Sequence, residues 1–378
     1  MTPDINIAPR AWAEIDLEAA RNNYRTLRKA AGGAKMMCVI KGDAHGHGAV
    51  PLGKALAEEG ADAFGVAALS EGIALRKAGI EQPVLVLGWT PAQLADQLVS
   101  YRLTQSILDE AYANELNAAC EGPDAPLDVH IKLDTGMTRT GIFAQKDHKK
   151  AAEAVCRIDQ LPNLRITGIF THFAVADVPE QDGFTEWQRG NFCAVLDEMK
   201  KLGFDKDIVR HASNSAGILF HPDCRFDMVR AGVALYGFDP TNGEDGVEGI
   251  TPILTLKTHV AQVKDIPKGA KISYGCIYEA PRDMTVAVAA AGYADSYPRA
   301  LSGKGAWAVI NGQKAPQVGR ICMDMCMFDV TGLDVRRGDE VILYGNGGMT
   351  LEQITNLTGG INCETTSLLT NRVARIYK

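Results

Sequence analysis

Short apolar runs alternate with helix-like stretches from residue 11 to about residue 240, and this alternation limits the folds that are open to the chain. The apolar runs span residues 11–15, 36–40, 63–67, 83–87, 103–108, 127–133, 164–170, 207–209 and 226–229. Between them, apolar residues recur at helical spacing, as at Phe192, Val195 and Met199. Roughly eight strand-helix units predict a (β/α)8 barrel over residues 10–240, with a doubly wound open sheet as the alternative.

The pattern changes after residues 239–249, which are rich in Asp, Glu, Asn and Gly and indicate a linker. Shorter alternating segments follow at 253–263, 285–290, 306–310, 327–330 and 340–343. Asn311-Gly312, between two of them, is typical of a two-residue hairpin turn. Residues 243–378 are therefore predicted to form a separate, mainly β domain, which residues 1–9 could join.

The composition excludes several classes of function. The chain has 378 residues and a formal net charge of -7, whereas nucleic acids and anionic membranes select basic surfaces. No apolar run approaches the length of a membrane span, and residues 1–10 lack the apolar core of a signal peptide. The nine cysteines form no CxxC pair, which indicates reduced thiols rather than disulfides or a zinc site. We expect a cytoplasmic protein without a metal, a nucleic-acid partner or a membrane partner.

The apolar run 36–40 ends in Lys41, and a glycine-rich turn follows. A lysine at the edge of an apolar strand is poorly hydrated, so its pKa should fall and its free amine should become available for a Schiff base. Pyridoxal phosphate requires such an amine. Two other interpretations of this stretch are open. Lys41 could lie over the core with its ammonium group in water, or His45 and His47 could ligate a metal.

Polar residues of catalytic type stand where several predicted strands end, which is where a barrel builds its active site. They are Lys41, Lys132, the segment 134–139, Thr171-His172, the segment 211–215 and the segment 230–233. Each could be structural: a capping serine, a histidine with satisfied hydrogen bonds, or a surface arginine. Their repeated occurrence at matching positions favours a functional site.

A set of motifs runs in order along the whole chain. They are Val39-Ile40-Lys41, His130-Ile131-Lys132-Leu133-Asp134-Thr135-Gly136-Met137, Thr171-His172-Phe173-Ala174, Asn214-Ser215-Ala216, Asp227-Met228-Val229-Arg230, Ser273-Tyr274-Gly275, Gly292-Tyr293-Ala294-Asp295, Gly319-Arg320-Ile321-Cys322-Met323-Asp324 and the segment 372–377. This set resembles the fold-type III pyridoxal-phosphate alanine racemase family. The resemblance implies a homodimeric enzyme that converts L-alanine to D-alanine for peptidoglycan, with pyridoxal 5'-phosphate as cofactor and an active site shared between subunits.

The resemblance also assigns the two bases that racemisation needs. Lys41 would carry the cofactor as a Schiff base and act on one face of the substrate α-carbon, and Tyr274 of a second subunit would act on the opposite face. Two bases are needed because a single fixed base tends to return a proton to the face from which it came. A tyrosine, whose usual pKa is about 10, needs nearby positive charge at neutral pH. His172 and Arg139 are the candidate suppliers of that charge.

The other site residues follow from the same resemblance. Arg230 would hydrogen-bond the pyridine nitrogen and, because arginine keeps its proton, would leave this nitrogen unprotonated. Arg139 and the Met323 amide would hold the substrate carboxylate, and a carbamylated Lys132 would orient Arg139. The further cofactor contacts would come from His45, His172, Asn214, Ser215, Gly232 and Val233, and the further substrate contacts from Tyr293 and Cys363.

Two positions depart from the family pattern, which has tyrosine at both. His45 could still donate a hydrogen bond to phosphate, whereas Cys363 leaves more room above the substrate methyl group. We therefore expect a wider substrate range than alanine, including serine.

A fold-type III decarboxylase or lyase and a non-catalytic pyridoxal-phosphate carrier are the alternatives to a racemase. Composition alone would also allow a sugar-binding or metal-dependent barrel enzyme.

Overall fold

The computed structural model describes residues 9–120 and 126–378, and the chain divides into two compact units. The barrel unit contains residues 24–44 and 49–235, and the β unit contains the residues up to Asn23, the segment 45–48 and residues 236–378. The sequence-based domain limits, 10–240 and 243–378, stay a prediction, because the compact units divide the chain in a more interleaved way. The sequence also allowed residues 1–9 to join the second domain. Of these residues, only Pro9 belongs to the described part of the chain.

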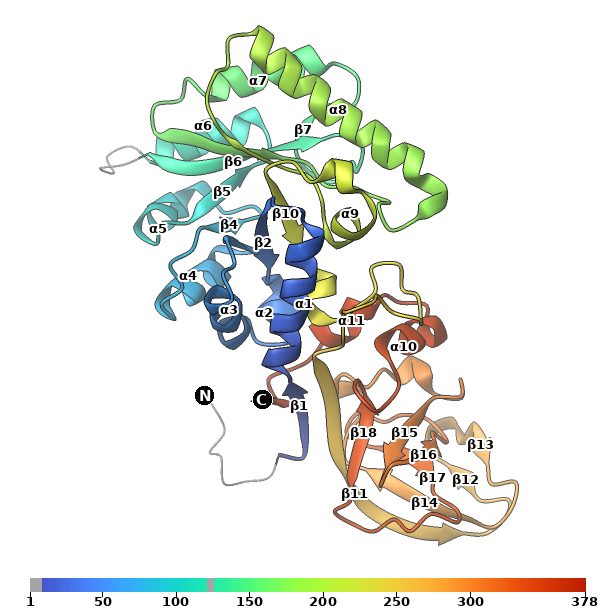
Figure 1. Ribbon diagram of the computed structural model, residues 1–378. Coiled ribbons are helices and arrows are strands. Elements are labelled where there is room, and N and C mark those ends of the chain that lie inside the picture. The colour runs from blue at the N-terminus through green and yellow to red at the C-terminus, as the bar shows by residue number, and fades with distance from the viewer. Residues whose placement is uncertain (1–8, 121–125) are drawn as a thin grey trace. The chain divides into compact units, whose positions relative to one another are not determined.

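Eight parallel strands of the described barrel unit close into a ring (Figure 1). They are β2 (Lys35–Val39), β3 (Ala63–Val66), β4 (Val84–Val86), β5 (Thr104–Ile107), β6 (Leu127–Asp134), β8 (Leu164–Phe170), β9 (Val209–His211) and β10 (Met228–Ala231). Each pairs with the next in this order, and β10 pairs with β2 to close the ring. The two-residue strand β7 (Ile142–Phe143) lies beside β6. The predicted (β/α)8 barrel is confirmed, and the closed ring excludes an open sheet.

Helices follow the strands and bury one apolar face each. They are α3 (Ala49–Glu58), α4 (Leu69–Lys77), α5 (Ala95–Ser100), α6 (Glu110–Ala119), α7 (His148–Ile158), α8 (Asp182–Lys201) and α9 (Ser215–Phe220), preceded by α1 (Leu17–Ala30). In α8, Phe192, Val195 and Met199 are buried as their spacing predicts, and each such side chain contributes roughly 1.5–3 kcal/mol. Within residues 9–120 and 126–378, no helix combines the length and the apolar character that a membrane crossing requires.

The first apolar run of the sequence does not belong to the barrel. This strand, β1 (Ala11–Ile15), pairs antiparallel with β11 (Leu254–Ile266) and parallel with β19 (Ala374–Tyr377) in the sheet of the β unit. Its inclusion in a barrel over residues 10–240 was wrong, because a buried strand has the same apolar pattern whichever sheet it joins. The barrel therefore begins at β2, and Lys41 follows its first strand.

The β unit is built on a twisted, mainly antiparallel sheet with two short helices. Its other strands are β14 (Met284–Ala289), β15 (Trp307–Ile310), β16 (Gln313–Pro316), β17 (Cys326–Asp329) and β18 (Glu340–Tyr344), with the small pair β12 (Lys271–Ile272) and β13 (Tyr278–Glu279), and its helices are α10 (Leu351–Thr358) and α11 (Asn362–Ser367). The predicted hairpin is confirmed, since β15 and β16 pair antiparallel around Asn311 and Gly312. Both turn residues have positive φ angles, 49° and 75°, as a two-residue hairpin requires.

Candidate active site

Lys41 follows the buried residue Ile40 at the C-terminal end of β2 and is itself half-buried. The four residues after it have φ angles of 63°, 51°, 55° and 51°, so the segment α2 (Lys41–His45) is one left-handed turn. The Ala44 N–H donates to Ile40 O at 2.9 Å within this turn. Left-handed backbone costs a residue other than glycine about 1–2 kcal/mol. Three such residues stand here, which marks the turn as strained.

Lys132 lies on β6 with only 6% of its surface exposed, and its Nζ donates to Thr140 Oγ1 at 2.5 Å. Burial, together with the charges of Arg139 and Arg230, lowers the pKa of Lys132 to about 8. At neutral pH the Lys132 amine is therefore uncharged in roughly a tenth of the protein molecules. An uncharged buried amine is the form that reacts with electrophiles.

Asp134, at the end of the same strand, organises the loop that carries Arg139. Its Oδ1 accepts hydrogen bonds from the Gly136 N–H (3.1 Å) and the Thr138 N–H (2.9 Å). Arg139 itself is exposed, yet its charge lowers the pKa of Lys132, His172 and Arg230. The structure thus brings the positive charge of the loop close to the end of the barrel.

Arg230 is buried, with 3% of its surface exposed, and its guanidinium is held by groups from the neighbouring strand ends. It donates to Thr171 O and Ala212 O, both at 2.7 Å, to His172 Nδ1 at 3.1 Å and to His211 Nδ1 at 3.0 Å. Burial lowers the pKa of Arg230 to about 9, which leaves it protonated at neutral pH. The site thus contains a fixed, desolvated cation.

The contacts of Arg230 fix the protonation of three histidines. Because arginine only donates, Nδ1 of His172 and of His211 must accept, so each carries its proton on Nε2. His211 Nε2 then donates to His130 Nδ1 at 2.9 Å. Burial lowers the pKa of His130 to about 4 and that of His172 and His211 well below its usual value. The expectation that His172 supplies positive charge is wrong, since it is neutral.

His211 stands in the polar segment 211–215 that the sequence singled out, but neither His211 nor His130 was given a specific role. A signal was present, because His130 stands two residues before Lys132, and alternate residues of a strand share a face. Its ring contacts that of His211, which in turn stacks on Phe170 at 4.8 Å between ring centres. His130 lies on β6 and His211 on β9, and the sequence could not show that β8 pairs with both strands and so brings the two histidines together.

The predicted phosphate ligands lie together where β9 and β10 end. Ser215 Oγ accepts the Gly232 N–H at 2.9 Å, and Asn214 Oδ1 caps α9 by accepting the Gly217 N–H at 2.9 Å. Val233 begins the next 3-10 turn, η4 (Val233–Tyr236). A Cβ atom added to Gly232 would meet only Ser215 Oγ, at 3.8 Å, so there is room for a ligand beside this backbone.

Tyr274 presents its ring at the surface of the β unit. It begins the 3-10 turn η5 (Tyr274–Cys276), and 69% of its surface is exposed. Ser273 before it has a φ of 65°, and its Oγ donates to Arg320 O at 2.7 Å. The turn is thus tied down while the phenol is accessible. Beside it lies a hollow of about 480 Å³, which Ser273, Tyr274, Cys322 and Met325 help to line.

Tyr293 and Met323 stand on two loops that hydrogen-bond to each other. The Tyr293 N–H donates to Cys322 O at 3.0 Å, and the Ala294 N–H donates to Met323 O at 3.1 Å. A Cβ atom on Gly292 would lie 2.2 Å from Cys322 O, so this close approach requires glycine. Within residues 9–120 and 126–378, the Met323 N–H has no hydrogen-bond acceptor. It is therefore available to a ligand.

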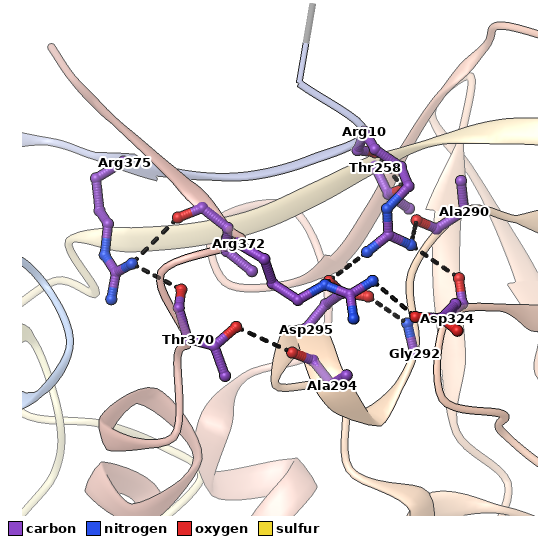
Figure 2. Close-up of polar contacts among 11 residues, drawn as sticks. Arg10, Thr258, Ala290, Gly292, Ala294, Asp295, Asp324, Thr370, Arg372 and Arg375 are labelled. Atoms are coloured by element: carbon purple, nitrogen blue, oxygen red, sulfur yellow. Dashed lines mark hydrogen bonds and ion pairs between the residues drawn. The ribbon is translucent and has the colours of Figure 1, made fainter. Parts of the chain in front are cut away.

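Figure 2 shows the ion-pair network that holds these two loops. Asp295 is fully buried; its Oδ1 contacts Arg10 at 2.5 Å and Arg372 at 3.1 Å, and its Oδ2 accepts the Gly292 N–H at 2.9 Å. Arg372 also pairs with Asp324 at 2.7 Å, one residue after Met323. One carboxylate thus links both ends of the chain to the loops.

The two positions that depart from the family pattern also lie in the β unit. His45 is buried, and its ring centre is 4.7 Å from that of Tyr236, on which His47 also stacks. Among the described residues, no group of three or more His, Cys, Asp or Glu side chains could hold a metal ion. Cys363 is half-buried in α11, where its N–H donates to Asn362 Oδ1 at 2.8 Å.

A closed barrel with a lysine and two arginines at its strand ends, joined to a β unit that presents a tyrosine, is the arrangement of an amino-acid racemase. The comparisons agree. The family model "Alanine racemase, N-terminal domain" matches residues 15–240 and "Alanine racemase, C-terminal domain" matches residues 253–377. The chain belongs to the alanine racemase family, so the lyase, carrier and other barrel-enzyme alternatives are set aside.

Individual relatives match over nearly the whole chain. The alanine racemase of Clostridium tetani is 40% identical over 97% of this chain and 95% of its own. A solved alanine racemase of Clostridium difficile 630 superposes with a TM-score of 0.91 at 35% identity, covering 99% of this chain and 97% of that one. The alanine racemase of Bartonella henselae, solved with covalently bound pyridoxal phosphate, has a TM-score of 0.87 at 28% identity over 98% and 100% of the two chains.

Replacing Asp295 with asparagine tests the loop network. Breaking a buried ion pair typically costs about 3–5 kcal/mol, and we expect the lower end because the two arginine side chains are 37% and 40% exposed. The measurement is the urea midpoint of unfolding. The control is Asp334→Asn, whose partner Arg336 is 78% exposed, and this change should leave the midpoint nearly unaltered. Equal midpoints for the two variants would contradict the role of Asp295.

Proposed function

We propose that this protein racemises alanine with pyridoxal 5'-phosphate bound covalently to Lys41. The observation that carries the proposal is Arg230, a buried cation held by neutral histidines and carbonyl groups at the strand ends. The relative from Bartonella henselae that holds this cofactor covalently supports it. When bound, pyridoxal phosphate draws electrons from the substrate α-carbon and so makes its proton acidic.

The residues of the barrel unit fit this cofactor. Lys41 offers an amine at a strand end, and Arg230 offers a donor that keeps its proton and so would face an unprotonated ring nitrogen. The open space beside Gly232, with the Ser215 hydroxyl next to it, suits a phosphate held by hydroxyl and backbone N–H donors. Asn214, Val233 and His172 of the barrel unit and His45 of the β unit complete the proposed set of cofactor contacts.

The two bases act on opposite faces of the substrate in this proposal. The Lys41 amine takes or returns the proton at the α-carbon on one face, and the Tyr274 hydroxyl does the same on the other. Arg139 and the Met323 N–H hold the substrate carboxylate, which fixes the plane that separates the two faces. Tyr293 and Cys363 bound the space for the side chain. Neutral His172 acts as a hydrogen-bond donor through Nε2 rather than as a charge.

We also propose that a second copy of the chain supplies Tyr274, as the family resemblance implies. The β unit exposes a group of apolar side chains around Tyr274, and such patches mark interaction surfaces. They are Tyr274, Ile277, Tyr293, Met323 and Met325, which are between 42% and 69% exposed. A twofold dimer would cover this surface twice and build two equivalent sites.

The Tyr274→Phe variant tests the two-base arrangement. Racemisation should fall by roughly 10²–10⁴-fold, because one proton-transfer group is lost. In D2O, the variant should still exchange the α-hydrogen of one alanine enantiomer, the one whose hydrogen faces Lys41, and not that of the other. Chiral chromatography and NMR measure the two reactions. The control is Tyr278→Phe, a nearby half-buried tyrosine outside the proposed site, which should keep wild-type activity.

Mixing variants tests the shared site. Lys41→Ala and Tyr274→Phe, each inactive alone, should recover roughly a quarter of the wild-type activity when they are unfolded and refolded together, since half of the dimers then hold one intact site. Recovery in the mixture with no recovery in either variant alone supports a site built by two copies. Full racemase activity of Tyr274→Phe alone would overturn the two-base proposal.

Cys363 is proposed to widen the substrate range. We expect the wild-type protein to racemise serine at a kcat/KM within about tenfold of that for alanine, and Cys363→Tyr to lower the serine value about tenfold or more, because pocket volume discriminates on this scale. The control is Ser367→Tyr, an exposed position on the same helix. An unchanged ratio of serine to alanine in Cys363→Tyr would show that Cys363 does not border the side-chain pocket.

Lys132 is proposed to be carbamylated. Its pKa of about 8 leaves uncharged amine, which adds to CO2 and releases a proton, so the modification should increase as the pH rises from 6 to 9. The product is an anion able to pair with Arg139. Protein equilibrated with 13C-bicarbonate should show a carbamate NMR signal that Lys132→Gln lacks. The absence of this signal at pH 9 in the wild-type protein would contradict the proposal.

A further inference from the structure

The strained turn after Lys41 is held by a side chain from another element. Glu71, in the first turn of α4, directs its carboxylate at this turn. Its Oε1 accepts the Gly42 N–H at 2.6 Å and the Asp43 N–H at 3.4 Å. Two further hydrogen bonds of the turn are local: Asp43 Oδ1 accepts the Ala49 N–H at 2.8 Å, and the Ala44 N–H donates to Ile40 O.

The second oxygen of Glu71 holds the neighbouring strand end. Oε2 accepts the Ala67 N–H at 2.7 Å and the Ala68 N–H at 3.1 Å, directly after β3. Strands β2 and β3 are paired in parallel, with Cys38 opposite Phe64, so their two turns are adjacent. One carboxylate therefore joins the turn after β2 to the turn after β3.

We propose that Glu71 is a positioning residue for Lys41. Four backbone N–H groups converge on one carboxylate, and charged hydrogen bonds of this kind are stronger than neutral ones. They hold the left-handed backbone that starts at Gly42, which sets the direction in which Lys41 leaves β2. The inference rests on the proposed function of Lys41. In this proposal Glu71, on α4, keeps the turn in its strained conformation and itself touches neither substrate nor cofactor.

The test is the near-isosteric change Glu71→Gln. The amide NH2 of glutamine cannot accept from a backbone N–H, so one of the two turns loses its acceptor. We expect kcat for alanine to fall roughly 10- to 100-fold, while KM changes less than about threefold, because misplacement of a reacting group by a fraction of an ångström acts mainly on the chemical step. The matched control is Glu110→Gln, a first-turn glutamate of α6 that pairs with exposed Arg157.

A second readout needs no activity. In protein freed of pyridoxal phosphate, hydrogen exchange at Gly42 and Asp43 should be at least about tenfold faster in Glu71→Gln than in the wild type or in Glu110→Gln. Adding Ala44→Gly to Glu71→Gln should recover part of the lost kcat, because glycine adopts the left-handed conformation without the steric cost. A purely structural role of Glu71 predicts no such recovery.

Several outcomes would overturn the inference. Unchanged exchange at Gly42 and Asp43 in Glu71→Gln would show that the carboxylate does not hold the turn. A lower melting temperature with wild-type kcat would make Glu71 an ordinary helix cap. If the wild-type protein does not racemise alanine, the proposed function fails instead, and the exchange measurement still decides whether Glu71 clamps the turn.

Discussion

The pairing of β10 with β2 closes the barrel, and the positions of the site residues in this unit depend on that closure. In the register of this pair, Arg230 lies opposite Met37, four residues before Lys41. Because all strands of the ring are parallel, their C-terminal ends meet on one rim, where Lys41, Arg139, His172 and Ser215 follow four different strands. An open sheet with the same strands would leave β2 and β10 unpaired with each other.

The electrostatics of this rim favour an anionic ligand. Burial lowers the pKa of both Lys132 and Arg230, and repulsion from Arg139 lowers both as well, which means that each cation is costly to keep there. The histidines add no charge, since His130 and His211 are neutral links that orient Arg230. A bound phosphate or carboxylate would offset this repulsion. A bound anion would therefore stabilise the cations in their positions, and the cations would in turn bind the anion.

Periodicity predicted most of the barrel, while the motifs predicted most of the candidate site, and the failures have physical causes. β1 was placed in the wrong unit because its apolar pattern does not show which strands it pairs with. Those strands, β11 and β19, lie more than 200 residues away in the sequence. The neutral state of His172 could not be read from sequence, because it depends on burial and on Arg230 as donor. The hairpin at Asn311-Gly312 was predicted correctly because its conformation is local.

A carboxylate that accepts hydrogen bonds from backbone N–H groups lies beside three of the proposed site residues. Asp134 accepts backbone N–H groups of the loop that carries Arg139, Glu71 accepts those of the turn after Lys41, and Asp295 accepts the Gly292 N–H next to Tyr293. A carboxylate suits this task because it has several acceptor sites and no donor, and a hydrogen bond to a charged group contributes about 1.5–3 kcal/mol. That is comparable with the cost of holding one or two residues in left-handed backbone. Loops that would otherwise relax can thus be kept in a single strained conformation, which is the condition for delivering a proton to one chosen face of a carbon atom.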